Sequence, residues 1–517
     1  MLRALTRLGI ALAAALAVGL LVAMVTGLAV GDVRGASDNG DGSRLYCGAG
    51  LVPATYDGES AWVGGVVVDY AVGEPCDDPI PSSALLMLRA AVGDAGAGTV
   101  FSLTSLGWLY VAAVSALTGL AAWLVTKRSR RRVLYLLSAA IPLANPDFSR
   151  FFVSTYGEPA GLLGTYALLL GLAAVLATSR TDRLTRSLAL LLVAFGGLFT
   201  IAAKVAYAPV LVAAVAVCLL TPVALASRWR PWTARLVGPF VAVAVAVAGV
   251  PVVQAGIEWQ ERNYPVGNVH NLVFTAVIPE IPDAPSQLGL PDEAADFAGV
   301  PIQVAPPDQP GRVELAADPA AIRTEALALV LRHPDVVLRG LGLALQATKG
   351  SDLAYIDADA WQSGSGVTDS GPAPDSERGR LLAGQQSASS ESLAAWTDQM
   401  STPWLPTAIV VLGLVALVAG AVVRRGSASH LALLAGVASA TAIGLAIVAL
   451  ADGYFELAKH VWLASYLVDV TAWALLGAVV AWIQHDLGWE STAAEGQRFP
   501  PEVDDRQAAP AHPGVTR

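Results

Sequence analysis

The chain has 517 residues, of which 55% are hydrophobic and only 14% charged, whereas soluble domains carry about 25% charged residues. This composition excludes an ordinary soluble protein and predicts an all-α polytopic membrane protein. The formal net charge of −10, from 42 acidic and 32 basic side chains, gives no support to nucleic-acid binding.

Ten apolar runs approach the length of about 20 residues that a helix needs to cross a bilayer. They lie at 8–29, 101–125, 133–146, 160–178, 187–203, 205–226, 236–256, 404–423, 430–451 and 461–484. The first run exceeds the roughly 7 to 15 apolar residues of a signal-peptide core, which favours a retained helix over a cleaved signal. The third run is short, and Pro142 and Pro146 predict that it bends or ends below the membrane surface.

Basic residues collect in alternate connections between these runs, and such connections are typically cytoplasmic. They are Arg3, Arg7, Lys127, Arg128, Arg130, Arg131, Arg132, Arg180, Arg183, Arg186, Arg228, Arg230, Arg235, Arg424 and Arg425. We therefore expect a multi-pass protein of the cell membrane with both termini in the cytoplasm. The other connections, including 30–100, 147–159, 257–403 and 452–460, are then extracytoplasmic.

This topology divides the chain into four parts. We expect an N-terminal transmembrane module at 1–256 with catalytic outer loops at 30–100 and 147–159, an extracytoplasmic segment at 257–403, a C-terminal transmembrane module at 404–485, and a disordered cytoplasmic tail at 486–517. Apolar periodicity predicts helices at about 318–332 and 335–348, separated by Pro334, which lie on the membrane rather than cross it.

The three cysteines agree with this sidedness. Cys47 and Cys76 share an outer loop, where an oxidising environment permits a disulfide, whereas Cys218 lies in a span. The alternative is two unpaired small residues. The cysteine spacing gives no zinc pattern.

A short polar stretch, Ser37-Asp38-Asn39-Gly40-Asp41-Gly42-Ser43-Arg44, directly follows the first span. A carboxylate here could remove a proton from an acceptor hydroxyl as a sugar bond forms, and nearby cations could hold the departing phosphate. Asp41 with Arg44 is the first choice for this chemistry, and Asp38 is the second. The alternative is a solvated turn, because Asn-Gly and Asp-Gly are turn signals.

The second outer connection adds charge on the same face. Asp147, Arg150, Tyr156 and Glu158 lie between the third and fourth spans. Charged side chains this close to hydrocarbon usually line a cavity, although they can also extend to water at a helix end.

Four further polar residues fall in outer connections. Lys204 sits in a tight turn and suits an anionic partner such as a lipid phosphate, or a headgroup contact. Glu456 and His460 are four residues apart and would share a helix face, either at the site or in a salt-bridged helix start. His270 could contact substrate or be solvated.

Together these motifs resemble the GT-C superfamily of polyprenyl-phosphate-sugar-dependent glycosyltransferases, and more narrowly a bacterial group of cell-surface glycan hexosyltransferases. The resemblance covers most of residues 1–485. Its motifs are Asn39–Arg44, Phe152–Glu158, Asn271–Phe274 followed by Gln287–Pro291, and Asp452–Glu456 with His460.

The resemblance implies transfer of a sugar from a polyprenyl-phosphate donor to a cell-envelope glycan, lipid or protein hydroxyl, with inversion, at an extracytoplasmic active site. It implies Asp41 as catalytic base and Glu158 as the second acidic residue, with Asp38 and Asp147 as further catalytic candidates. The substrate-binding candidates are Arg44, Arg150, Tyr156, Lys204, His270, Glu456 and His460. Some members use a divalent cation such as Mg²⁺ or Mn²⁺, but no Asp-x-Asp stands in the second outer loop, so the metal stays open.

Two other functions remain as alternatives: a lipid-linked glycan transporter or flippase, and a non-catalytic scaffold for envelope assembly. A transporter should carry ionisable residues near the middle of its spans, where substrate passes. The predicted spans are nearly free of them, and Asp469 is the main exception. This distribution favours an enzyme that acts on a membrane-bound donor.

Overall fold

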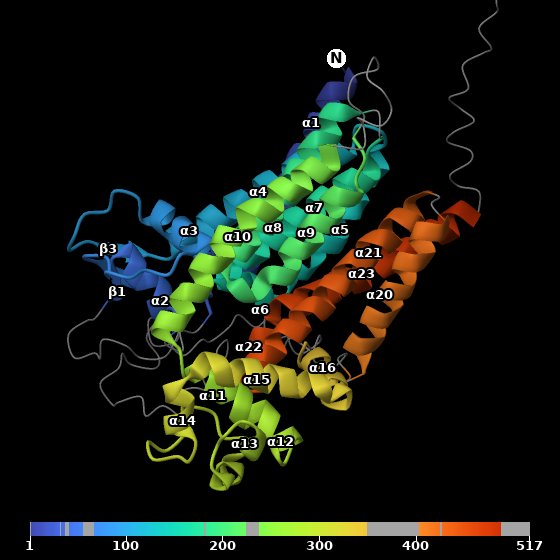
Figure 1. Cartoon of the computed structure of the whole chain (residues 1–517). Helices are drawn as coiled ribbons and strands as arrows, with labels where there is room; N and C mark the ends of the chain where they lie inside the picture. Colours follow the sequence, from blue (N-terminus) through green and yellow to red (C-terminus); the bar gives the residue numbers. More distant parts are fainter. Residues whose placement is uncertain are drawn as a thin grey trace, which may run out of the picture.

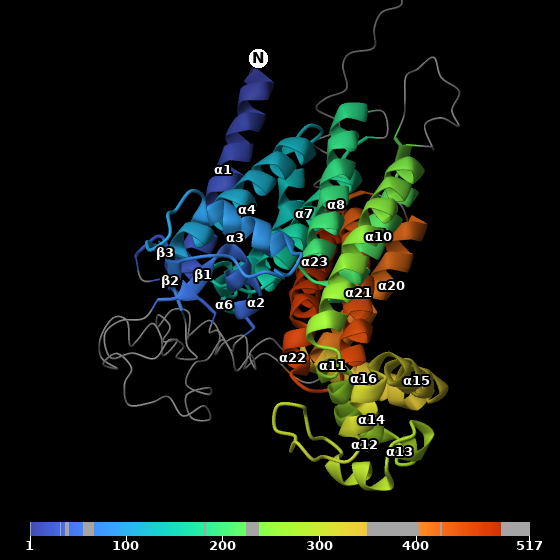
Figure 2. The same cartoon turned by 60° about the vertical axis from the view of Figure 1, so that its left-hand side comes forward.

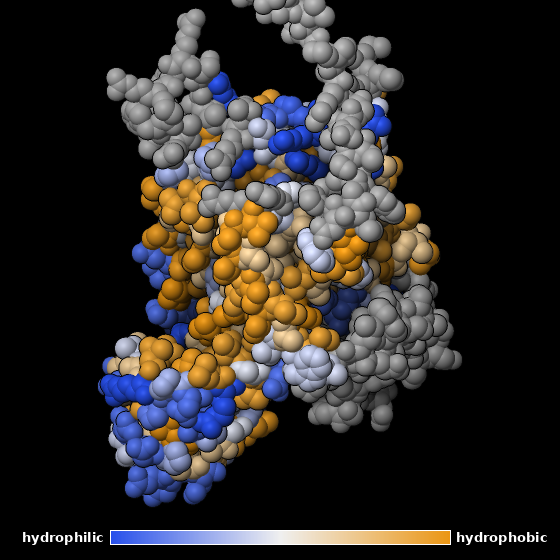
Figure 3. Space-filling model, turned by 90° about the vertical axis from the view of Figure 1, so that its right-hand side faces the viewer, coloured by the Kyte–Doolittle hydropathy of each residue, from blue (hydrophilic) through white to orange (hydrophobic). Residues whose placement is uncertain are grey.

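The computed structural model describes residues 2–31, 33–36, 41–54, 67–179, 182–223, 237–348, 402, 404–423 and 426–486. Within these residues, eight helices are long and apolar enough to cross a membrane, which confirms the all-α polytopic class. They are α1 (Leu2–Val25), α4 (Thr104–Val125), α7 (Glu158–Ala177), α8 (Arg183–Ala203), α10 (Val237–Asn263), α20 (Leu405–Val423), α21 (Gly426–Ala449) and α23 (Trp462–Asp486). They form one bundle, and an apolar surface separates its two polar ends (Figures 1 and 3).

The third predicted span is a broken segment rather than a continuous helix. It consists of η2 (Arg130–Leu136), α5 (Leu137–Ala140), η3 (Ile141–Ala144), α6 (Pro146–Ser149) and η4 (Arg150–Phe152). Backbone groups freed by the breaks need other partners inside a membrane. Tyr466 Oη donates to the carbonyl of Ala139 at 2.8 Å, and Trp462 Nε1 donates to that of Asp147 at 2.8 Å. The predicted interruption is therefore present, and side chains of α23 provide hydrogen bonds to backbone carbonyls of the broken segment.

The sixth predicted run is also shorter than expected. It forms the single-turn 3₁₀ helix η5 (Val205–Tyr207) and α9 (Ala208–Leu220), which together remain below the length of the eight spanning helices. α9 packs between α8, α10 and α21.

Close contact between α7 and α8 depends on glycine. A Cβ atom on Gly196 would lie 2.6 Å from the carbonyl oxygen of Gly164, which is closer than packed atoms allow. Small residues let helix backbones approach in this way inside membranes. α7 is the most buried of the eight spans: 94% of its most apolar 18-residue stretch is buried inside the protein.

The first loop forms a small antiparallel sheet that the sequence analysis did not predict. Its elements are α2 (Ser43–Tyr46), η1 (Cys47–Ala49), β1 (Leu51–Pro53), β2 (Asp69–Val72), α3 (Ser83–Val92) and β3 (Val100–Ser102). β2 is the central strand, and it pairs Val72 with Leu51 and Tyr70 with Phe101. Tyr70 is almost fully buried, so the sheet packs one face against the rest of the fold.

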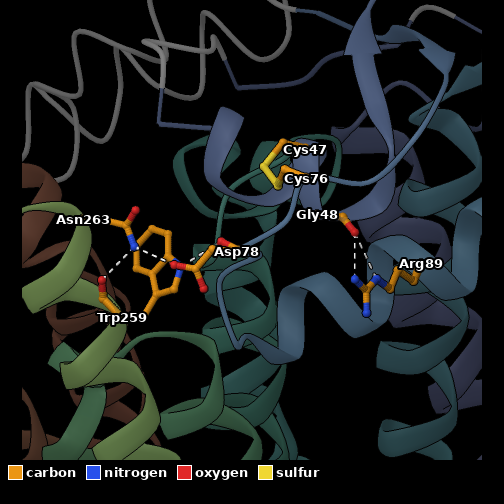
Figure 4. The surroundings of a disulfide bond; sticks show 7 residues. All are labelled: Cys47, Gly48, Cys76, Asp78, Arg89, Trp259 and Asn263. Atoms are coloured by element: carbon orange, nitrogen blue, oxygen red, sulfur yellow. Dashed lines mark hydrogen bonds between the residues drawn. A yellow bond between two sulfur atoms is a disulfide. The ribbon is translucent and has the colours of Figure 1, made fainter.

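A disulfide between Cys47 and Cys76 closes this loop, as the sequence predicts (Figure 4). The side chain of Arg89 on α3 donates two hydrogen bonds to the carbonyl of Gly48, at 2.8 and 3.1 Å. Beyond the disulfide, the backbone carbonyl of Asp78 accepts a bond from Trp259 Nε1 at 3.1 Å. The loop is thereby fixed to the end of α10.

A second helical unit follows α10 and has a core of its own. It contains α11 (Gly267–Asn271), the π-helix η7 (Leu272–Val277), α12 (Ile278–Glu280), α13 (Ala284–Gln287), η8 (Asp292–Phe297), α14 (Arg312–Ala317), α15 (Pro319–Arg332) and α16 (Pro334–Ala347). The last two match the helices predicted at 318–332 and 335–348. They lie across the end of the bundle and are too short to count among its spans (Figures 1 and 2). η9 (Leu450–Asp452) and α22 (Leu457–His460) then connect α21 to α23.

Replacement of glycine by alanine should affect stability differently at Gly196, which packs against α7, and at Gly9, where the surrounding space is open. Gly196→Ala should lower thermal stability, because overpacking a helix contact costs roughly 1–3 kcal/mol. Gly9→Ala in α1, where nothing lies within 4 Å of the new Cβ, should be neutral or stabilising, since alanine favours helix by about 1 kcal/mol over glycine. Thermal unfolding of the purified variants in detergent measures both. Equal stability of the two variants would contradict the role of Gly196.

Candidate functional site

Charged side chains from four separate stretches meet at the end of the bundle that carries the disulfide loop. The first stretch is α2 with the residue before it, the second is the start of α7, the third is the turn after α8, and the fourth is α22 with its N-cap. These residues are Asp41, Arg44, Glu158, Lys204, Glu456 and Lys459.

Asp41 is the centre of the first group. Its carboxylate accepts a hydrogen bond from Lys459, 418 residues away in the chain, and pairs with Arg44 at 2.7 Å between Oδ1 and Nη2. The side chain of Lys459 is only 7% exposed and also contacts Glu456, with 3.1 Å between Nζ and Oε2. This ion pair links the first loop to the C-terminal helices.

Glu456 has an unusual backbone. Its φ of 49° makes it the single non-glycine residue with positive φ in the described part of the chain. Such conformations cost free energy and persist where the surrounding structure holds them, often at functional sites. Here the left-handed residue precedes α22, so that Glu456 and Lys459, three residues apart, face each other.

Arg44 is held by the chain that follows α10. Its Nε atom donates to the hydroxyl of Tyr264 at 3.2 Å, and its guanidinium lies 4.4 Å from the centre of the Tyr264 ring. The aromatic face attracts the cation and fixes its direction. The guanidinium is thereby positioned beside Asp41.

The second group is the pair of Glu158 and Lys204. Lys204 Nζ lies 3.2 Å from Glu158 Oε1, and the side chain of Glu158 is 4% exposed. Glu158 is the first residue of α7, where the helix dipole favours a negative charge. The sequence places Lys204 opposite because α8 ends at Ala203 and packs against α7.

Members of both groups line one pocket of about 70 Å³, to which Glu456 and Lys459 do not contribute. Asp41, Arg44, Tyr156, Glu158, Lys204 and Trp259 contribute to its wall. The pocket therefore brings together the carboxylates of the first loop and of α7 with cations from both groups.

Electrostatic interactions keep Asp41 and Lys459 ionised. Burial by itself would raise the pKa of Asp41, but Lys459, Arg44 and Lys204 outweigh it, and the pKa is lowered from 3.8. Burial likewise opposes the charge of Lys459, and the neighbouring Asp41 and Glu456 raise its pKa. At neutral pH Asp41 is thus ionised and Lys459 protonated.

The substrate-binding candidate His460 is uncharged and does not line the pocket. Burial, together with Lys204 and Lys459, lowers the pKa of His460 to about 3. Its Nδ1 atom lies 3.7 Å from Asp452 Oδ2, which is beyond hydrogen-bond distance. His460 is therefore neutral at physiological pH and adds no positive charge for a phosphate.

Four other predicted site residues lie apart from the pocket or outside the described chain. His270 is fully buried in the second helical unit, where Nε2 bonds Gln309 Oε1 at 3.1 Å and the ring stacks on Phe274, so it is not solvated. Asp147 and Arg150 are buried in the broken third span and do not line the pocket. Asp38 lies outside the described residues.

Lys459 and Tyr264 are the members of the site that the sequence analysis did not select. Lys459 stood in the motif that supplied Glu456 and His460, and its spacing of three from Glu456 was the available signal. Nothing in the sequence near Tyr264 indicated a contact with Arg44.

The carboxylates of the site do not form a metal-binding set. Among the described residues, no three Asp, Glu, His or Cys side chains gather as ligands would, and Asp41, Glu158 and Glu456 each contact a lysine or arginine. The positive charge at the site comes from the protein's own lysines and arginines.

The fold and this pocket define a polytopic α-helical membrane protein with a charged site at one end of its bundle. The chain belongs to the family described as the YfdI N-terminal transmembrane domain, whose model matches residues 2–296. That range includes Asp41, Arg44, Glu158 and Lys204 but ends before Lys459. No curated protein and no solved structure matches the chain.

The site predicts strong coupling between Asp41 and Lys459. In a double-mutant cycle with Asp41→Asn and Lys459→Met, the free energy of unfolding should show a coupling of about 1–3 kcal/mol. The pKa of Asp41 is lowered on folding, so this contribution should be present at neutral pH and decline as pH falls below about 3.8. Unfolding in mixed micelles at several pH values measures it.

The exposed pair of Asp78 and Arg262 provides the control. Both side chains are more than half exposed, at 52% and 57%, so the same cycle there should show little coupling. Additive effects at Asp41 and Lys459 would contradict the buried ion pair.

Proposed function

We propose that this protein is an integral membrane glycosyltransferase of the GT-C type. It moves a sugar from a polyprenyl-phosphate donor to a hydroxyl of a cell-envelope glycan, lipid or protein. The observation that carries the proposal is the ionised Asp41 carboxylate at the end of an apolar bundle. It shares a pocket with Arg44 and Lys204, and it also contacts the buried Lys459. A lipid-linked phosphate needs such an arrangement, with apolar helices for its chain and cations for its phosphate.

The cations have a direct use in this reaction. The bond between the sugar and the donor phosphate breaks, and its electron pair leaves with the phosphate. Arg44, Lys204 and Lys459 are placed to stabilise that negative charge, since charge-assisted hydrogen bonds to phosphate are strong. Tyr156 and Trp259 add aromatic surface to the same wall.

Asp41 serves as the general base in this mechanism. It takes the proton of the acceptor hydroxyl while the hydroxyl oxygen forms its bond to the anomeric carbon. In the free protein the lowered pKa makes Asp41 a weak base. A donor phosphate competes for Lys459 and Arg44, and this competition raises the basicity of Asp41 when the donor is bound.

Glu158 has a supporting role. It is nearly buried and contacts Lys204, so it fixes the direction of that cation within the pocket. Attack by the acceptor opposite the phosphate gives inversion at the anomeric carbon in a single displacement.

We also propose that the pocket faces the outside of the cell and that both termini face the cytoplasm. The disulfide loop and the pocket share one end of the bundle, whereas the basic stretch at Lys127–Arg132 lies at the other (Figure 1). Disulfides form in oxidising compartments, and basic connections remain inside. Both features support the same orientation.

Replacement of the base tests the proposed reaction. Asp41→Asn should lower the rate of sugar transfer from a polyprenyl-phosphate donor by about 100-fold or more, because a general base contributes on the order of 10² to 10⁴. The measurement is product formation by purified protein with radiolabelled donor and cell-envelope acceptor.

Asp78→Asn is the matched control, because Asp78 lies on the same side, is half exposed and does not line the pocket. It should retain full activity. Full activity of a folded Asp41→Asn variant would remove Asp41 from the role of base, and absence of transfer by the unaltered protein with every such donor would overturn the proposed function.

Orientation can be tested with single cysteines in a background without reactive thiols, since Cys47 and Cys76 are bonded and Cys218 is buried. Ala95→Cys lies in an exposed turn at the pocket end, and Arg130→Cys is exposed at the other end. A membrane-impermeant maleimide should label position 95 in intact cells and position 130 only after lysis. The reverse pattern would place the pocket in the cytoplasm.

A further inference from the structure

A large groove lies at the end of the bundle opposite the pocket. It has a volume of about 870 Å³, within the roughly 300–1,000 Å³ typical of small-molecule sites. One wall comes from η2 and α5 of the broken third span, and the other comes from α21 and α23. The groove therefore lies between the N-terminal and C-terminal helices. We infer that it binds an anionic phospholipid of the surrounding leaflet.

Three arginines form the charged part of the groove: Arg128, Arg131 and Arg132. Arg132 donates to the backbone carbonyl of Ala177, which holds it against the end of α7. Arg128 and Arg131 are exposed, and in the part of the chain that the structure describes no carboxylate pairs with either. Two cations therefore remain available to an anionic headgroup.

Two neighbouring basic residues, Arg186 and Lys127, are engaged elsewhere and do not line the groove. Arg186 donates to the carbonyls of Val175 and Thr178 at 3.0 and 3.1 Å. Lys127 pairs with Asp182 at 2.6 Å. Arg128 and Arg131 therefore supply uncompensated positive charge within the groove itself.

Apolar side chains form much of the remaining lining of the groove. Leu137 of α5 and Leu476 and Val480 of α23 line it, and each is between 44% and 52% exposed. Trp473 of α23 lies among them and is 40% exposed. Cations at one end and aliphatic and aromatic side chains along the length fit a phosphate headgroup with acyl chains. Basic pockets between membrane helices bind anionic lipid headgroups for this reason.

The charge requirement selects the lipid. Phosphatidylcholine carries a compensating positive charge, whereas phosphatidylglycerol presents a net negative headgroup to Arg128 and Arg131. The occupant that we assign is a phospholipid of the phosphatidylglycerol type. This assignment does not depend on the proposed sugar transfer, since it concerns a different end of the bundle.

The test measures lipid retained by the purified full chain. The protein is titrated with phosphatidylglycerol or phosphatidylcholine in mixed micelles, and bound lipid is counted by native mass spectrometry. Phosphatidylglycerol should bind at least about tenfold more tightly than phosphatidylcholine. Arg128→Gln with Arg131→Gln should weaken it by about tenfold or more, since each basic residue near an anionic lipid contributes on the order of 1 kcal/mol.

A matched variant removes the same charge elsewhere. Arg130→Gln with Arg183→Gln alters two exposed arginines that do not line the groove, and it should retain binding. Equal loss in both double variants, or equal binding of the two phospholipids, would overturn the site. Tighter binding of a polyprenyl phosphate than of phosphatidylglycerol would assign the groove to a carrier lipid and overturn the phospholipid.

Discussion

The ion pair between Asp41 and Lys459 is the constraint on which the site depends. A charge taken out of water is costly unless a partner lies close by, and Lys459 is almost fully buried. Its principal partner is on a loop near the other end of the chain. The first loop and the last helices must therefore assemble before Asp41 and Lys459 can meet. The matched family range alone supplies Asp41 and Glu158 but lacks this cation.

The same pair creates a conflict between stability and basicity. Each cation that stabilises the carboxylate also lowers the pKa of Asp41 and so weakens it as a proton acceptor. The conflict is resolved when another anion draws the cations away. In the proposed reaction that anion is the donor phosphate, so proton removal and donor binding become coupled through Lys459 and Arg44. A site with a solvated carboxylate would have no such coupling.

Local patterns in the sequence predicted local structure well. Pro142 and Pro146 indicated the broken third span, Pro334 separated α15 from α16, and the shared loop of Cys47 and Cys76 indicated their disulfide. Apolar length and composition were sufficient to predict the membrane bundle. Long-range pairings were not accessible, because neither the contact of Lys459 with Asp41 nor that of Tyr264 with Arg44 follows from spacing along the chain. The burial of His270 likewise depends on Gln309 and Phe274, which approach it only in the folded unit. The three-stranded sheet escaped prediction because its strands have only three or four residues.

The two ends of the bundle use positive charge in different ways. At the pocket, Arg44, Lys204 and Lys459 each have a carboxylate partner, so a ligand must exchange with an existing ion pair. At the groove, Arg128 and Arg131 lack such partners in the described chain, so an anion binds without displacing one. A ligand that displaces a carboxylate from its ion pair also changes the pKa of that carboxylate. A donor phosphate would in this way raise the basicity of Asp41 in the proposed reaction. Simple occupation favours a resident molecule, as a structural lipid between two helical modules would be. The distribution of carboxylates, more than that of arginines and lysines, therefore distinguishes the two ends of the bundle.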